Sequence, residues 1–201
     1  MIPIAVGTAS FFFILVSDWA DGRKLFAHKT AAVIAAAACL LYGMVALFFS
    51  PDRFFTAAGV KIAGAAAAAV FLFLLVYSLF LELPFRSTYS AAGGGKAVVS
   101  TGTYALTRHP GALFLFFFHA ALIAVCGSRP LLVALPFWTC ANCVLVGIED
   151  AVLFPRIFGS AYDEYKKSVP FIIPTAASMR QCYATIFPGL KSILRHKEKH
   201  Q

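Results

Sequence analysis

Two pairs of ionisable residues stand where apolar runs of this chain begin and end. Arg108 and His109 come directly before one apolar run, and Glu149 and Asp150 close the next one. Ionisable side chains at such positions are costly in a membrane and usually mark a functional site. Guanidinium and carboxylate groups bind charged or hydroxyl-bearing partners, and an imidazole exchanges protons near neutral pH. The spacing therefore predicts that two adjacent helices bring the four groups to one side of a membrane.

The composition is that of a membrane protein. Hydrophobic residues make up 60% of the chain and charged residues 13%, whereas soluble domains carry about 25% charged residues. The net charge of +8 does not indicate nucleic-acid binding, because the positive residues gather in the predicted loops and the C-terminal tail. The composition thus excludes an ordinary soluble enzyme and predicts no nucleic-acid partner.

Apolar runs long enough, or nearly long enough, to cross a bilayer recur along the chain. We predict membrane spans over residues 2–16, 30–49, 62–81, 111–126 and 131–148. Gly127 to Pro130 form a tight turn, so the last two spans are expected to make a helical hairpin. The predicted fold class is all-α: a polytopic membrane helix bundle of about five transmembrane helices with a C-terminal cytoplasmic covering segment.

The whole chain, 1–201, reads as a single membrane domain in three parts. Residues 1–83 hold three spans, 84–174 hold the hairpin and the covering segment, and 175–201 form a basic tail. Apolar and basic residues alternate at helical spacing over 186–200. This pattern predicts an amphipathic helix on anionic lipid headgroups, and a solvated tail without regular structure is the alternative.

Lysine and arginine predict the orientation in the membrane. They are dense in the first and third loops and above all in the tail, and sparse in the other loops. The positive-inside rule then places the N-terminus outside and the C-terminus in the cytoplasm, in a plasma (inner) membrane or the endoplasmic reticulum. The first apolar run has no positive segment before it, so we expect it to be retained rather than cleaved as a signal peptide.

Three further polar residues fall inside predicted spans. Cys140 and Cys143 form a Cys-x-x-Cys pattern, but without a second pair or clustered histidines we predict no metal site. Small residues are common where membrane helices pack closely. His119 is expected to form a hydrogen bond with a neighbouring helix.

Helical spacing predicts how the acidic pair is oriented. Trp138, Asn142, Leu145 and Glu149 recur at intervals of four, three and four residues and so share one helix face. We therefore expect Glu149 to point into the bundle and Asp150 to lie about 100° around the helix from it. The alternative is that the acidic pair merely ends the span among the lipid headgroups.

Several motifs occur in a fixed order. They are Gly102-x-Tyr104-x-x-x-Arg108-His109-Pro110, the hairpin, Glu149-Asp150, Phe158-Gly159-x-x-Tyr162-x-x-Tyr165, Val169-Pro170 and Ile173-Pro174. This ordered set, over residues 98–174, resembles the integral membrane methyltransferases of the isoprenylcysteine carboxyl methyltransferase and phospholipid methyltransferase superfamily. The earlier spans match that family only in being membrane spans.

The resemblance implies S-adenosylmethionine as cofactor and methyl transfer at the cytoplasmic face. The residues it assigns to cofactor binding are Tyr104, Arg108, His109, Pro110, Glu149, Asp150, Tyr162 and Tyr165, with catalytic roles for Arg108, His109 and Glu149. For this ligand, Arg108 suits the carboxylate, Glu149 suits the ammonium or the ribose hydroxyls, and His109 can accept a proton from an acceptor group. Tyrosine rings tolerate the sulfonium cation.

The sequence leaves the methyl acceptor open. A membrane site favours a lipid or lipid-modified substrate, such as an isoprenylcysteine-like carboxylate, a lipid amine or a hydrophobic thiol. One alternative is an NADPH-dependent membrane sterol or enone reductase, with Arg156, Lys166 and Lys167 at the 2′-phosphate. Another is a non-catalytic membrane homologue.

Overall fold

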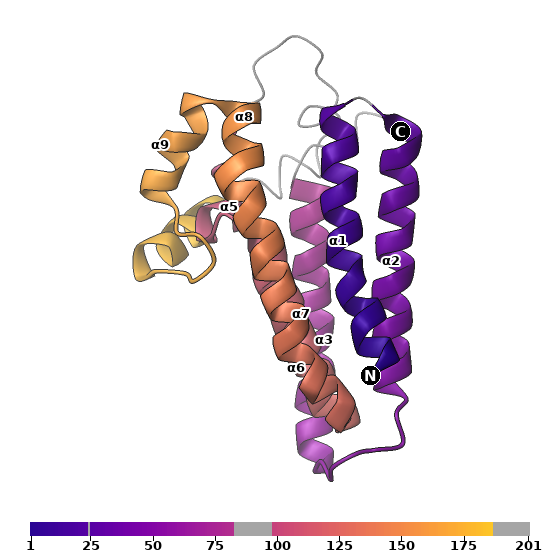
Figure 1. Ribbon diagram of the computed structural model, residues 1–201. Coiled ribbons are helices and arrows are strands. Elements are labelled where there is room, and N and C mark those ends of the chain that lie inside the picture. Colours follow the sequence, from indigo (N-terminus) through magenta and orange to yellow (C-terminus); the bar gives the residue numbers. More distant parts are fainter. Residues whose placement is uncertain (24, 83–97, 187–201) are drawn as a thin grey trace, which may run out of the picture. The chain divides into compact units, whose positions relative to one another are not determined.

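The computed structural model describes residues 1–23, 25–82 and 98–186. They form helices and turns, with no strand in these ranges. The predicted all-α membrane bundle is thereby confirmed. Most of the amphipathic helix predicted for the tail falls outside the described ranges. The elements, labelled in Figure 1, are α1 (Ile2–Gly22), α2 (Phe26–Phe48), α3 (Ala58–Val76), η1 (Tyr77–Glu82), α5 (Thr103–Leu106), α6 (Pro110–Cys126), α7 (Arg129–Ile148), η2 (Glu149–Leu153), α8 (Phe154–Phe158) and α9 (Ser160–Ser168).

Four helical stretches are long and apolar enough to cross a membrane. They cover Ile2–Asp21, Phe26–Phe48, Ala58–Glu82 and Arg129–Phe158. The first and last run beyond the predicted spans, because α1 continues to Gly22 and α7 passes directly into η2 and α8. The run predicted as the fourth span is α6, whose 17 residues make it the shortest apolar helix of the five.

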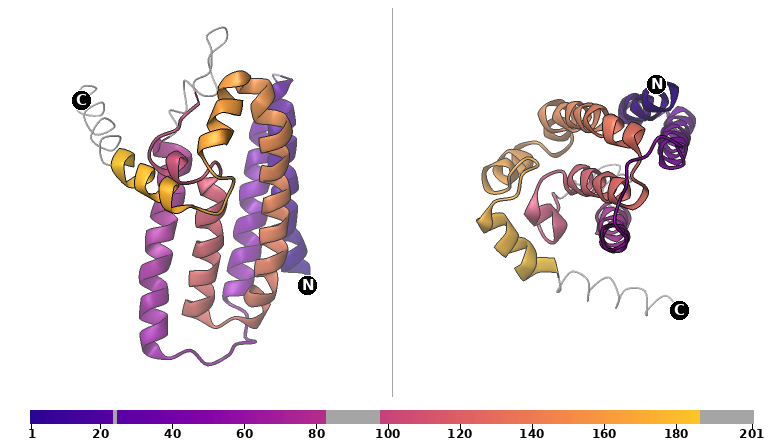
Figure 2. Two further views of the ribbon diagram at one scale, coloured as in Figure 1. Left: turned by 90° about the vertical axis from the view of Figure 1, so that its left-hand side faces the viewer. Right: turned by 90° about the horizontal axis from the view of Figure 1, so that it is seen from below.

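Contacts divide the chain into two compact units. The first comprises Met1–Ala69 with Phe116–Gly147, and the second comprises Val70–Leu115 with Ile148–Gln201. In the first unit, α1 and α2 pack side by side along their length, as the views in Figures 1 and 2 show. Every polar residue of the candidate site belongs to the second unit.

Trp138 of α7 is the centre of packing in the first unit. Its side chain is 1% exposed, and its indole N–H donates to the carbonyl of Ile4 at 3.1 Å. A Cβ atom at Gly7 would overlap the indole ring, and one at Gly43 would lie 3.1 Å from it. Small residues let the membrane helices approach closely here. The ring centroid of His119 lies 5.0 Å from that of Trp138, and its buried Nε2 has no hydrogen-bond partner in the described part of the chain, so the hydrogen bond expected of His119 is not formed at this atom.

The turn between α6 and α7 is held by the connection between α2 and α3. Gly127 has a φ of +63°, and its carbonyl accepts the N–H of Phe54 at 2.8 Å. Ser128 donates its hydroxyl to the carbonyl of Leu47 at 2.6 Å. Because a Cβ at Gly127 would overlap the Phe54 carbonyl, glycine is required at this position.

Two short π-helical segments distinguish the second unit. They are η1, which continues α3, and η2, which continues α7. π-Helical turns are rare and occur frequently at functional sites. η1 contacts α5, and η2 begins with the acidic pair Glu149 and Asp150. Both segments therefore support the elements from which the site is built.

Candidate functional site

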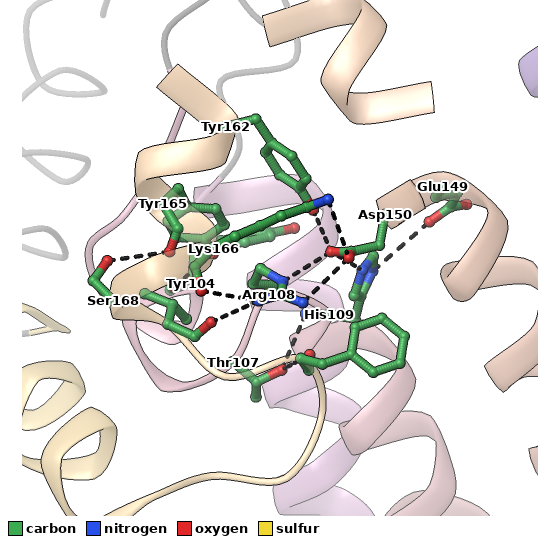
Figure 3. Close-up of polar contacts among 12 residues, drawn as sticks. Tyr104, Thr107, Arg108, His109, Glu149, Asp150, Tyr162, Tyr165, Lys166 and Ser168 are labelled. Atoms are coloured by element: carbon green, nitrogen blue, oxygen red, sulfur yellow. Dashed lines mark hydrogen bonds and ion pairs between the residues drawn. The ribbon is translucent and has the colours of Figure 1, made fainter. Parts of the chain in front are cut away.

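The guanidinium of Arg108 is engaged on both sides by the protein. Its Nε donates to Oδ1 of Asp150 at 2.8 Å and its Nη2 donates to Oδ2 at 3.2 Å. Its Nη1 donates to the carbonyls of Val169 at 2.9 Å and Lys166 at 3.3 Å. Figure 3 shows the fork between the carboxylate and the C-terminal turn of α9. Arg108 thus fastens the segment after α9 to η2.

Asp150 is the hub of this network. Besides the two bonds from Arg108, its Oδ1 accepts the hydroxyl of Tyr162 at 2.6 Å. The Nε2 atom of His109 lies 3.4 Å from Oδ1, and the Nζ of Lys166 lies 3.7 Å from Oδ2. A charged carboxylate surrounded by this many donors is held in one orientation. We call this group of side chains the polar network: Arg108, His109, Glu149, Asp150, Tyr162 and Lys166.

His109 is buried between aromatic rings. It stacks on Phe154 at a centroid distance of 5.7 Å and meets Phe171 edge to face at 5.1 Å. Its Nδ1 faces Oε2 of Glu149 at 3.8 Å. Burial lowers the pKa of His109 from 6.5 to about 4, against the opposing effect of the Asp150 carboxylate. This low pKa favours the neutral imidazole at physiological pH, and Nε2 is the ring nitrogen that faces Asp150.

Hydrogen bonds hold Thr107 and Arg108 against the segment that follows α9. The N–H of Arg108 donates to the carbonyl of Pro170 at 2.9 Å. Thr107, which is fully buried, donates its hydroxyl to the carbonyl of Phe171 at 2.9 Å and accepts the N–H of His109 at 3.0 Å. Pro110 then opens α6, at a first-turn position that needs no backbone donor.

The two tyrosines of α9 form the core of the covering segment. Tyr162 and Tyr165 are 2% and 6% exposed and pack with Val169. Tyr165 donates its hydroxyl to the backbone carbonyl of Tyr104 at 2.6 Å. Burial raises the pKa of both phenols above its usual value, so both hydroxyls remain protonated donors. The side chain of Tyr104 donates to the carbonyl of Ser78 at 3.3 Å.

The structure brings the predicted residues together, and a π-helix begins at the acidic pair. The Asp150 side chain is 12% exposed and accepts the bonds described above, and the Glu149 side chain is 16% exposed and faces Nδ1 of His109 at 3.8 Å. The prediction extended a regular rotation of 100° per residue past Ile148. The chain turns instead into a π-helix at Glu149, whose wider turn changes the direction of the side chains that follow.

Sequence reasoning missed several residues of the site. Thr107 lies within the Gly102–Pro110 motif, directly before Arg108, but only the structure shows that it is buried. Lys166 was assigned only to the 2′-phosphate of the reductase alternative, whereas the structure places its Nζ 3.7 Å from Oδ2 of Asp150. Phe154 and Phe171 gave no signal, because their role depends on where the chain folds back. Cys140 and Cys143 are exposed on α7, and the described residues contain no cluster of three or more metal-ligating side chains.

The neutrality of His109 gives a pH prediction. Its pKa is about 4 in the folded protein and 6.5 when unperturbed, so the unfolded chain takes up the proton first as the pH falls. The contribution of the uncharged His109 to the free energy of unfolding is therefore fully present above pH 6.5 and is lost progressively between about pH 6.5 and 4. Histidine carbon resonances of the detergent-solubilised protein, assigned by their loss in His109→Gln, should show no titration of His109 above pH 5. A midpoint near 6.5 would contradict the burial argument.

No protein-family model, no curated protein and no solved structure matches this chain.

Proposed function

We propose that this membrane protein is a methyltransferase that uses S-adenosylmethionine and acts at the cytoplasmic face on a lipid or lipid-modified acceptor. The observation that supports the proposal is the polar network itself. It contains a largely buried Arg108–Asp150 pair, with His109 and Glu149 beside it. The network stands between the end of one apolar helix and the start of another. A site next to membrane helices can be reached by an acceptor dissolved in the bilayer, whereas a water-soluble acceptor does not require a site in that position.

The groups present fit the chemistry of this cofactor. Carboxylates suit its ammonium and its ribose hydroxyls, and aromatic rings suit its sulfonium. Rings in this unit already lie against cations, since Lys166 Nζ is 5.1 Å from the Tyr162 ring and Arg108 is 5.5 Å from the Phe171 ring.

The protein's own contribution is mainly positioning. When bound, the cofactor supplies an electrophilic methyl group, and transfer requires an in-line approach of the acceptor. Nδ1 of His109 faces Oε2 of Glu149 at 3.8 Å, so the proton released by an amine or thiol acceptor would pass to this His109–Glu149 pair. A carboxylate acceptor needs no base, and His109 then serves only to order the site.

The reductase alternative has less support. Of its three proposed phosphate ligands, Lys166 lies 3.7 Å from Asp150 and Lys167 donates to Glu164 at 2.6 Å. Lys166 thus already faces a largely buried carboxylate, which disfavours a phosphate on it, whereas the exposed Lys167–Glu164 pair has little influence.

The test is a calorimetric titration of the purified protein with S-adenosylhomocysteine, with NADPH in a parallel cell. We expect binding of S-adenosylhomocysteine in the micromolar range and none of NADPH. Binding of NADPH alone would replace the proposal with the reductase. Silence from both ligands, with the protein shown to be folded, would favour the non-catalytic homologue.

A further inference from the structure

The segment that carries Arg108 and His109 begins in a conformation that only glycine adopts easily. Gly102 has φ +58° and ψ −130°, a region essentially closed to other residues. A Cβ atom there would overlap Oε1 of Glu82, the last residue of η1. The backbone at Gly102 and the Glu82 carboxylate are therefore in direct contact, and glycine is what permits it.

Glu82 binds the start of α5 through several hydrogen bonds. The N–H of Thr103 lies 2.9 Å from Oε1 and 3.1 Å from Oε2 of Glu82. The hydroxyl of Thr103 also donates to Oε2, and Thr103 is 1% exposed. The carboxyl group of Glu82 thus accepts hydrogen bonds from both the backbone and the side chain of Thr103. A second attachment comes from Thr185, whose hydroxyl accepts the N–H of Gly102 at 2.8 Å.

The other end of the same segment is fastened to the covering segment. Arg108 and Thr107 bond to the carbonyls of Pro170 and Phe171, and Tyr165 bonds to the carbonyl of Tyr104 in between. Residues 102–109 are thus clamped at both ends, with α5 as a single short helix between the clamps. A displacement of the Thr103 backbone would therefore also displace Arg108, because the short segment between them is fixed at both ends.

We propose that Glu82 is a positioning residue for the ligand site: by holding Gly102 and Thr103 it sets where Arg108 and His109 stand, an inference that rests on the proposed function. Glu82 itself acts through Thr103 and α5 and touches none of the groups of the polar network in the bonds described here. Its place at the end of η1 makes the π-helical turn of α3 part of the site's support.

The experiment compares Glu82→Ala with Glu82→Gln in the full-length protein, using two measurements. The first is the affinity for S-adenosylhomocysteine. The second is hydrogen–deuterium exchange of peptides covering residues 101–109, measured without ligand. Loss of the charged acceptor in Glu82→Ala is expected to weaken binding by roughly tenfold or more and to speed exchange. Glutamine retains an acceptor for the Thr103 N–H, so Glu82→Gln is expected to bind within about threefold of the wild type.

A matched pair of variants tests the contact itself. Thr103→Ser keeps the hydroxyl that donates to Glu82 and should behave as the wild type, whereas Thr103→Val removes it and should weaken binding in the same direction as Glu82→Ala. Gly102→Ala should do less harm in the Glu82→Ala background than in the wild type, because the overlapping carboxylate is gone. If Glu82→Ala does not fold, the Thr103 pair gives the same comparison.

The outcomes separate this inference from the proposed function. Unchanged affinity and unchanged exchange in Glu82→Ala and Thr103→Val would overturn the positioning role while leaving the cofactor proposal intact. No binding by the wild-type protein would overturn the cofactor proposal, and with it the ligand-positioning role. The exchange measurement would then still decide whether Glu82 holds residues 101–109.

Discussion

Replacement of Asp150 by alanine is expected to lower the free energy of unfolding by roughly 3 kcal/mol and to abolish S-adenosylhomocysteine binding. The Arg108 and Asp150 side chains are only 13% and 12% exposed, so removal of the carboxylate leaves a largely buried cation without its counter-ion. It also leaves the Tyr162 hydroxyl without its acceptor. Denaturant unfolding in detergent measures the first effect, and calorimetric titration measures the second.

Two further variants show whether the loss comes from the network. Asp150→Asn keeps the shape and one acceptor oxygen, so its loss of stability should be intermediate. Glu164→Ala removes the partner of Lys167 from the same covering helix, but both of those side chains are at least 70% exposed. Exposed pairs contribute little, so Glu164→Ala should leave the unfolding free energy nearly unchanged. Equal losses in Asp150→Ala and Glu164→Ala would refute the central place given to Asp150.

Arg108→Lys is expected to lose S-adenosylhomocysteine binding almost as completely as Arg108→Ala. Arg108 forms two bonds to one carboxylate and two to backbone carbonyls, and a lysine ammonium cannot reproduce that planar fork. If Arg108 instead acted as a simple charge toward the ligand carboxylate, lysine would retain much of the affinity. The two roles therefore predict opposite results for one substitution.

The control for this series is Arg156→Lys in α8, an exposed residue for which we expect wild-type binding. Arg108→Ala combined with Asp150→Ala should destabilise the protein less than the sum of the single variants, because the cation and the carboxylate compensate each other. Additive losses would mean that the two side chains act independently, contrary to the bonds described above.

The meeting of Arg108 and His109 with the acidic pair was predictable from the sequence, because each pair adjoins an apolar run and the turn at Gly127 is short. Which of these side chains bond to one another was not predictable. The start of a π-helix at Glu149 has no reliable signature in a single sequence, and the donors to Asp150 come from other elements of the fold. Arg108 was assigned to the ligand, and that assignment stays a prediction, but its fork is used within the protein.

Contacts between distant parts of the chain were beyond the sequence reasoning altogether. Glu82 ends a span that was read only as hydrocarbon-compatible, and its partner Thr103 lies twenty-one residues further on. Nothing local to either residue indicates the pairing. The positive φ of Gly102 would have been a fair guess from a Gly-Thr-Tyr sequence, but the carboxylate that occupies the space of its missing Cβ becomes visible only in the fold.

The length of α6 has a consequence for the bilayer around the protein. Its 17 residues at about 1.5 Å each rise roughly 26 Å, whereas the hydrocarbon layer is about 30 Å thick. A helix of this length that crosses the bilayer creates a hydrophobic mismatch, which the lipids relieve by thinning locally at a modest cost per ångström. Arg108 and His109 at the start of α6 then lie at the level where acyl chains meet headgroups. A thinner membrane would reduce this mismatch, so the protein should be more stable in bilayers of shorter acyl chains.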